Sequence, residues 1–174
     1  MAAAARWRAR ALDPPKGASP HRWQAACAAA AFVETDRLLD SSDSIRWLAD
    51  RRLAHIVQQS LLHRHGTVYD LVAYVVMPSH CHVAFMPLGD TSGNRPFRQA
   101  ILQSLKRYTA CRCNEVLGRS GRFWQPESFD RVVRGEASLE RVVAYIERNP
   151  VKAGLCKKPE EWEFSSAHAR PPRL

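Results

Sequence analysis

Two histidines one residue apart, His80 and His82, are the side chains whose type and spacing point most directly to chemistry. They stand in a segment with a strand-like pattern, where alternate side chains point to one face and their Cα atoms lie roughly 7 Å apart. Two imidazoles on one face of a rigid strand can bind a single divalent metal ion. The alternative is a chance pair of histidines on the wet face of a sheet, and the spacing alone does not decide between the two.

A β-hairpin is expected to carry the histidines. Apolar and β-branched residues run up to Met77, a Pro-Ser pair interrupts them, and an extended pattern resumes at His80. This pattern predicts two strands within residues 68–88, joined by a tight turn. Because side chains alternate along a strand, we expect Cys81 and Val83 to point away from the histidines, into the core.

A helix predicted over residues 139–149 carries the second group of candidates, and Ser138 and Pro150 are expected to cap and end it. Tyr145 and Asn149 lie four residues apart at the border of its apolar stripe, where the tyrosine hydroxyl can reach a cleft and the asparagine carbonyl can add a neutral metal ligand. The alternatives are a tyrosine that only packs and an asparagine that only ends a helix. The stripe is predicted to consist of Leu139, Val142, Val143 and Ile146.

The chain carries a formal charge of +9 at pH 7. Such a charge favours a polyanionic partner, nucleic acid first and an anionic membrane surface second, although a generally basic protein fits the charge about as well. Basic residues gather just after the histidines, between 95 and 134, so we expect a DNA-facing surface near the metal. The residues that we assign to DNA contact are Lys106, Arg107, Arg112, Arg122, Trp124, Arg131 and Arg134. For Trp124, the alternative to DNA contact is a core anchor.

Cysteine usage and hydropathy indicate the compartment. The five cysteines are odd in number and form no C-x-x-C pair, so neither a disulfide framework nor a zinc ribbon is indicated, and reduced thiols in the cytoplasm are expected. The longest apolar run, over residues 25–33, has about half the length that crosses a bilayer. We therefore expect no membrane partner.

The remaining pattern predicts one α+β domain over residues 25–167, preceded by a disordered basic arm over 1–24 and followed by a flexible tail over 168–174. Besides the hairpin, the expected elements are a first strand over 28–35, helices over 45–65 and 96–117, and an extended segment over 123–133. The inner side of the helix over 96–117 is assigned to Phe97, Ile101, Leu105, Tyr108 and Cys111.

Taken together, the motifs resemble those of the REP-associated tyrosine transposases, single-tyrosine members of the HUH superfamily. Residues 76–82 read Val-Met-Pro-Ser-His-Cys-His, which is similar to the family run Val-Met-Pro-Asn-His-hydrophobic-His except for Ser79. Residues 145–154 read Tyr-Ile-Glu-Arg-Asn-Pro-Val-Lys-Ala-Gly and match the family pattern Tyr-Ile-x-x-Asn-Pro-Val-x-x-Gly. The resemblance extends from about residue 66 to 167, and its further parts are a lysine-bearing helix at 103–108, a Phe-Trp-Gln segment at 123–130 and the ending at 161–166.

The resemblance implies an HUH endonuclease fold, an antiparallel ferredoxin- or RRM-like sheet that carries the His-x-His strand with helices packed on it. It further implies that His80, His82 and Asn149 bind Mg²⁺ or Mn²⁺ and that Tyr145 is the nucleophile. The expected activity is nicking and rejoining of hairpin-bearing single-stranded DNA from repetitive palindromic elements, through a 5′-phosphotyrosine. Trp124 would stack on unpaired bases of this DNA. The protein would be a monomer or a homodimer in the cytoplasm, associated with the nucleoid.

Four alternatives stay open, one of which is a basic structural module without catalysis. Tyr108 competes as nucleophile, although the residue four positions later is arginine rather than a polar ligand. A catalytically silent DNA-binding protein derived from a transposase would keep the fold and the basic face. A nucleotide hydrolase with a histidine nucleophile would need a third alternating histidine, where the chain has Ala84.

Overall fold

The computed structural model describes residues 9–40, 45–89, 98–126, 128 and 132–169. The chain divides into two compact units, Met1–Ile45 and Arg46–Leu174. Within the described ranges, no helix has both the length and the apolar composition that crossing a membrane requires.

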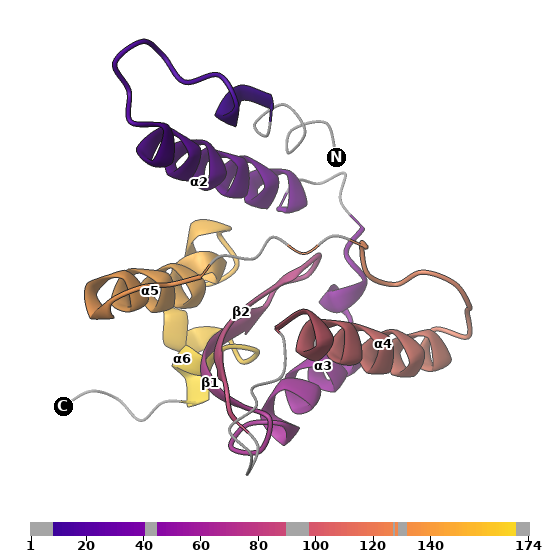
Figure 1. Ribbon diagram of the computed structural model, residues 1–174. Helices are drawn as coiled ribbons and strands as arrows, with labels where there is room; N and C mark the ends of the chain where they lie inside the picture. The colour runs from indigo at the N-terminus through magenta and orange to yellow at the C-terminus, as the bar shows by residue number, and fades with distance from the viewer. Residues whose placement is uncertain (1–8, 41–44, 90–97, 127, 129–131, 170–174) are drawn as a thin grey trace, which may run out of the picture. The chain divides into compact units, whose positions relative to one another are not determined.

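One long helix, α2, spans Pro20–Leu39 in the first unit (Figure 1). The predicted strand over 28–35 is therefore wrong, and the helix also includes the last residues of the segment predicted to be irregular. Alanine has the highest helix propensity, and the alanine run in this segment outweighs the β preference of the few branched residues beside it. Pro20 stands in the first turn, where its fixed φ suits a helix start.

The second unit is built on the predicted β-hairpin. Strand β1, Tyr69–Val76, pairs antiparallel with β2, Cys81–Pro87, with Val75 opposite His82. A register shift between Leu71 and Ala73 places a bulge in β1. This confirms the prediction that an antiparallel sheet carries the His-x-His strand.

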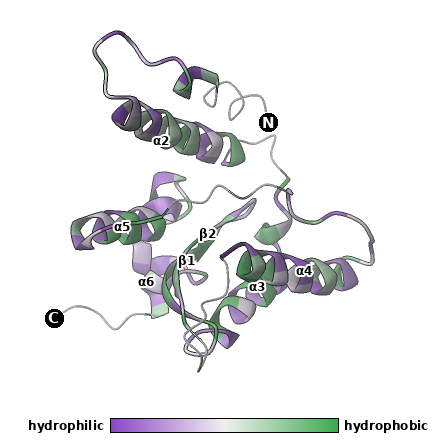
Figure 2. Cartoon of the chain, in the orientation of Figure 1, coloured by the Kyte–Doolittle hydropathy of each residue, from purple (hydrophilic) through white to green (hydrophobic). Residues whose placement is uncertain are grey.

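Helices cover both faces of this hairpin, and both faces are apolar (Figures 1 and 2). On one face, α3 (Arg51–His63) and α4 (Arg98–Val116) contribute to a first core cluster, which includes Leu53, Val57, Tyr74, Val76, Ile101 and Leu105. Cys81 and Val83 pack against it, as predicted. On the other face, α5 (Glu136–Lys152) contributes to a second core cluster of Ala73, Val75, Met77 and Ile146, against which Tyr145 packs.

The inner side of α4 differs in part from the prediction. Ile101 and Leu105 are buried as expected, whereas Tyr108 is 54% exposed and Cys111 is also exposed. The buried positions continue instead at Thr109 and Cys113, four residues apart, because 3.6 residues per turn keep i, i+4 positions on one ridge. Phe97 lies outside the described residues.

Helix α5 begins earlier and ends later than predicted. Its N-cap is Gly135 rather than Ser138, and Gly135 adopts φ 80°, which glycine tolerates without strain. The helix also continues through Pro150 to Lys152. Past the proline, the Ala153 backbone N–H donates to the Asn149 carbonyl at 2.9 Å, which is the regular i→i−4 bond of a helix. The preference against helical geometry before proline is therefore outweighed here by the packing of the buried Pro150.

The C-terminal segment lies along β1. After a 3₁₀ turn at Pro159–Glu161, the Trp162 indole N–H donates to the Val76 carbonyl at 3.0 Å, and an isolated bridge joins Val75 and Ser165. The short helix α6, Ser166–Ala169, follows. By contrast, the described part of the segment over 123–133, which was predicted to be extended, contains no strand.

Candidate active site

The two histidines at the start of β2 converge. Their Nε2 atoms lie 3.1 Å apart, and their ring planes are inclined by 79°. His80 is 7% exposed and His82 is half-buried. The two side chains therefore lie on the same face, as predicted, and their Nε2 atoms also approach each other closely.

This arrangement fits one metal ion. Two nitrogens that each lie about 2.1 Å from an ion, at right angles, are themselves ~3 Å apart. The observed 3.1 Å between the Nε2 atoms matches that separation. The pair is thus suited to a divalent cation that accepts imidazole ligands.

Ser79, the residue that departs from the family motif, supports the first ligand. Its Oγ lies 3.0 Å from His80 Nδ1, and the Met77 backbone N–H donates to the His80 carbonyl at 2.8 Å to close the turn. When Nδ1 carries the proton and donates it to Ser79 Oγ, Nε2 carries the lone pair that a metal needs. Sequence reasoning noted Ser79 as the departure from the family motif beside His80, but did not predict its contact with the His80 ring.

Tyr145 contacts the histidine pair from the opposing helix. Its ring lies edge to face with that of His82, with centroids 5.8 Å apart and planes inclined by 73°. The Nζ atom of Lys152 lies 5.4 Å from the centroid of the Tyr145 ring. The competing nucleophile, Tyr108, stands on α4, which packs against the first core cluster on the other face of the hairpin.

Asn149 stands one helical turn after Tyr145 and is only 1% exposed. Its backbone carbonyl accepts the Ala153 N–H at 2.9 Å, within the last turn of α5. This position is consistent with the role predicted for Asn149, but its assignment as a third metal ligand stays a prediction.

Cys81, between the two histidines, is a thiol rather than a further ligand. Burial raises the pKa of Cys81 to about 11, and the positive charge of Lys106 opposes that rise only in part. The side chain packs against the first core cluster, on the face opposite the histidines, so it is not placed to join them as a ligand.

The arginines assigned to DNA contact are on the surface where the structure describes them. Arg107 and Arg112 are exposed on α4, and Arg122 and Arg134 are exposed on the segments that follow. Arg112 forms an ion pair with Glu115 at 2.6 Å, which offsets part of its charge. Arg131, also assigned to this surface, lies outside the described residues.

Lys106 and Trp124 have structural contacts instead. Lys106 Nζ donates to the backbone carbonyls of Gln125 and Pro126, at 2.9 Å and 3.4 Å. The Trp124 indole N–H donates to Thr109 Oγ1 at 2.8 Å, and its ring packs against the first core cluster. These contacts favour the core-anchor alternative for Trp124, while its stacking on DNA stays a prediction.

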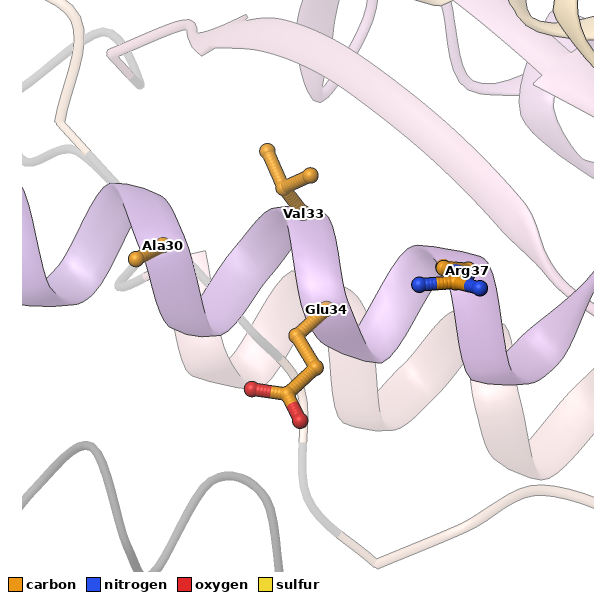
Figure 3. Close-up of a pocket in the computed structure, with 4 residues that line it drawn as sticks. All are labelled: Ala30, Val33, Glu34 and Arg37. Atoms are coloured by element: carbon orange, nitrogen blue, oxygen red, sulfur yellow. The ribbon is translucent and has the colours of Figure 1, made fainter.

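A shallow hollow lies along α2 in the first unit (Figure 3). The side chains that line it are Ala30, Val33, Glu34 and Arg37. They come from one face of a single helix and include one carboxylate and one guanidinium, which is not a constellation for catalysis or metal binding. The hairpin and α5, not this hollow, carry the candidate chemistry.

Comparison with known proteins identifies relatives of one kind. No family model matches the chain. The REP-associated tyrosine transposase of Escherichia coli K12 is 28% identical over 130 residues, which cover 70% of this chain and 72% of that protein. This chain is similar to the REP-associated tyrosine transposases. A putative REP-associated tyrosine transposase of Haemophilus influenzae is also 28% identical, over 106 residues that cover 58% of this chain and 60% of that protein.

The fold agrees as well. A solved structure of a REP-associated tyrosine transposase bound to a REP hairpin matches with a TM-score of 0.55 and 22% identity, over 74% of this chain and 72% of that chain. The likeness to that transposase structure supports the same fold, and the predicted α+β class with helices on an antiparallel sheet is confirmed.

Proposed function

We propose that this protein is a metal-dependent transposase that nicks and rejoins hairpin-associated single-stranded DNA through a tyrosine. The observation that carries the proposal is the contact between the Tyr145 and His82 rings, at 5.8 Å, beside a pair of imidazole nitrogens 3.1 Å apart. A nucleophile next to a metal-binding pair is what phosphodiester cleavage by tyrosine requires. The similarity to REP-associated tyrosine transposases supports the same conclusion.

His80 and His82 are the proposed ligands of Mg²⁺ or Mn²⁺, with the Asn149 side-chain carbonyl as the third ligand. When bound, the ion supplies a Lewis acid that polarises a phosphate oxygen. Ser79 fixes the orientation of the His80 ring through Nδ1. Helix α5 brings Asn149 into the buried layer one turn after Tyr145.

The reaction exchanges one phosphodiester for another. The Tyr145 oxygen attacks phosphorus, the bond between phosphorus and the 3′ oxygen breaks, and the phenolic proton is replaced by the new bond while the leaving oxygen gains a proton. The products are a 5′-phosphotyrosine and a free 3′-hydroxyl. In the reverse direction, a second 3′-hydroxyl attacks the phosphotyrosine and restores the phenol, so strands are joined without ATP.

The proposed substrate is a DNA hairpin with a single-stranded flank, by analogy with the relative bound to a REP hairpin. The exposed Arg107, Arg122 and Arg134 are suited to contact its backbone, since guanidinium groups bind phosphate in a bidentate manner. We place this activity in the cytoplasm, at the nucleoid. Because Tyr145 contacts His82 of the same chain, one subunit holds every proposed site residue, which suits a monomer and is compatible with a homodimer.

The test is formation of a covalent protein–DNA adduct. Purified protein is mixed with hairpin-bearing single-stranded DNA from the flanks of its own gene, with and without Mn²⁺, and separated on a denaturing gel alongside Tyr145→Phe. We expect an adduct that requires the metal and is absent in the variant. Binding without an adduct, over several flanking substrates, would contradict the proposal and favour a silent DNA-binding protein.

A further inference from the structure

Lys152 shares the site face of α5 with Tyr145. The two residues are seven apart, which is close to two helical turns, so they lie on the same face. The helix reaches Lys152 only because it continues through Pro150. Had the helix ended before the proline, no regular geometry would relate the lysine to the tyrosine.

The distance confirms that the two groups meet. Lys152 Nζ lies 5.4 Å from the centroid of the Tyr145 ring, within the range of a cation–π contact. The same ring also contacts His82. The positive charge of the lysine is therefore held at the side chain that contacts the metal-binding pair.

Helix stabilisation alone accounts for only part of this arrangement. A lysine in the last turn interacts favourably with the helix dipole whichever direction it points. That effect does not require the ammonium to lie against an aromatic ring. Lys152 is an exposed residue, so solvent reaches its side chain.

We propose that Lys152 is a phosphate-binding residue of the Tyr145 site, whose ammonium holds the DNA phosphate that the tyrosine attacks. The inference rests on the proposed function and names a residue that the motif resemblance leaves unassigned. A phosphodiester is an anion, and charge on its oxygens rises as the phenol oxygen adds to phosphorus. A fixed cation beside the ring then stabilises the transition state more than the bound substrate.

The first test compares three variants in single-turnover adduct formation at saturating hairpin DNA with Mn²⁺. Lys152→Met removes the charge, Lys152→Arg keeps it, and Lys157→Met removes an exposed lysine after the end of α5. We expect Lys152→Met to slow the adduct about 100-fold, Lys152→Arg to recover most of the rate, and Lys157→Met to match the unchanged protein. All three should bind Mn²⁺ with unchanged affinity, which controls for folding and for the histidine site.

The second test asks whether the lysine acts on the phosphate itself. The adduct first identifies the phosphodiester that the tyrosine attacks. DNA affinity is then measured for Tyr145→Phe and for Tyr145→Phe with Lys152→Met. Each protein is tested on DNA with the natural diester at that position and on DNA with a neutral methylphosphonate there. We expect Lys152→Met to weaken binding to the diester about 10-fold and to leave binding to the methylphosphonate unchanged. If Lys152→Met weakened binding to both DNAs equally, the inference would be overturned, because the lysine would then not interact with the negative charge of that phosphate.

The outcomes separate the two proposals. If the unchanged protein forms an adduct and Lys152→Met forms it as fast as Lys157→Met does, only the role of Lys152 is wrong. If the unchanged protein forms no adduct on any hairpin substrate, the proposed function fails and this inference fails with it.

Discussion

His82 and Tyr145 lie edge to face, with ring centroids 5.8 Å apart, although one stands on β2 and the other on α5. This contact joins the proposed metal-binding pair on the hairpin to the proposed nucleophile on the helix that covers it. Both elements pack through the second core cluster, so the site depends on the fit of α5 to one face of the hairpin.

Loss of either histidine should abolish metal binding. His80→Ala or His82→Ala removes one of two nitrogens 3.1 Å apart, and we expect Mn²⁺ affinity to fall by more than about 100-fold, because loss of even an outer hydrogen-bond partner costs about 10- to 100-fold. Calorimetric titration with Mn²⁺ measures this. His55→Ala, at an exposed position of α3, is the control and should bind as before. Unchanged affinity in the His82 variant would contradict the assignment of the ligands.

Ser79 should tune the metal site. Ser79→Ala removes the oxygen 3.0 Å from His80 Nδ1, and we expect Mn²⁺ affinity to fall about 10-fold with the thermal midpoint nearly unchanged. Ser79→Asn restores the residue usual in the resembling motif and should retain most of the affinity, because its amide oxygen can accept the same hydrogen bond. Equal affinities in the serine and alanine proteins would show that this hydrogen bond does not orient the ligand.

Ser166 should help to hold α5 in position against β1. Its Oγ accepts the Tyr74 N–H at 3.2 Å and lies 2.9 Å from Glu147 Oε1, to which it can donate, so it links β1 to the tyrosine helix. We expect Ser166→Ala to lower the free energy of unfolding by about 1–3 kcal/mol in urea titrations and to slow adduct formation, with Mn²⁺ affinity retained. Ser120→Ala, at an exposed turn, is the matched control. If Ser166→Ala lost Mn²⁺ affinity as well as adduct formation, its effect would not be confined to the position of α5.

Alkaline pH should destabilise the protein partly through Tyr69. Burial raises the pKa of Tyr69 from about 10 to about 12, so the unfolded chain loses this proton first. The stabilisation is thus complete below pH 10 and decreases as the pH rises from 10 to 12. The Tyr69 hydroxyl also donates to the Leu61 carbonyl at 2.8 Å. Tyr69→Phe should therefore cost about 1 kcal/mol at pH 8 but show a shallower alkaline loss in urea titrations from pH 8 to 12. An unchanged alkaline slope would contradict this attribution.

The hairpin and its histidines could be predicted from the sequence because local signals agree there. Period-two alternation, a Pro-Ser turn and β-branched residues all favour the same two strands. The same alternation placed Cys81 and Val83 opposite the histidines, and the structure confirms it.

The helix ends could not be predicted from local rules alone. Ser138 is a good N-cap by type, but Gly135 can adopt a positive φ and begins the helix a turn earlier. Pro150 was expected to end α5, yet it is buried with Asn149, and packing outweighs the local preference. For this reason, local rules do not predict that the helix continues to Lys152, on the face of Tyr145.

The segment over 28–35 was mispredicted for a related reason. A few branched residues suggested a strand, whereas the neighbouring alanines determine the helix α2. On α4, the buried ridge continues from Leu105 to Thr109 and not to the adjacent Tyr108. Thr109 was overlooked because its side chain carries a polar hydroxyl. That hydroxyl donates to the Leu105 carbonyl at 2.7 Å, which satisfies it in the core.

The most direct measurement is to identify the residue that carries the DNA. The adduct is digested with nuclease and trypsin, and the peptide with an attached nucleotide is sequenced by mass spectrometry. Cleavage after Arg141 and Arg148 gives the peptide 142–148, which contains Tyr145, and cleavage after Arg107 and Arg112 gives 108–112, which contains Tyr108. We predict the nucleotide on Tyr145. A nucleotide on Tyr108 would contradict the account, because the tyrosine that contacts His82 would then not be the nucleophile.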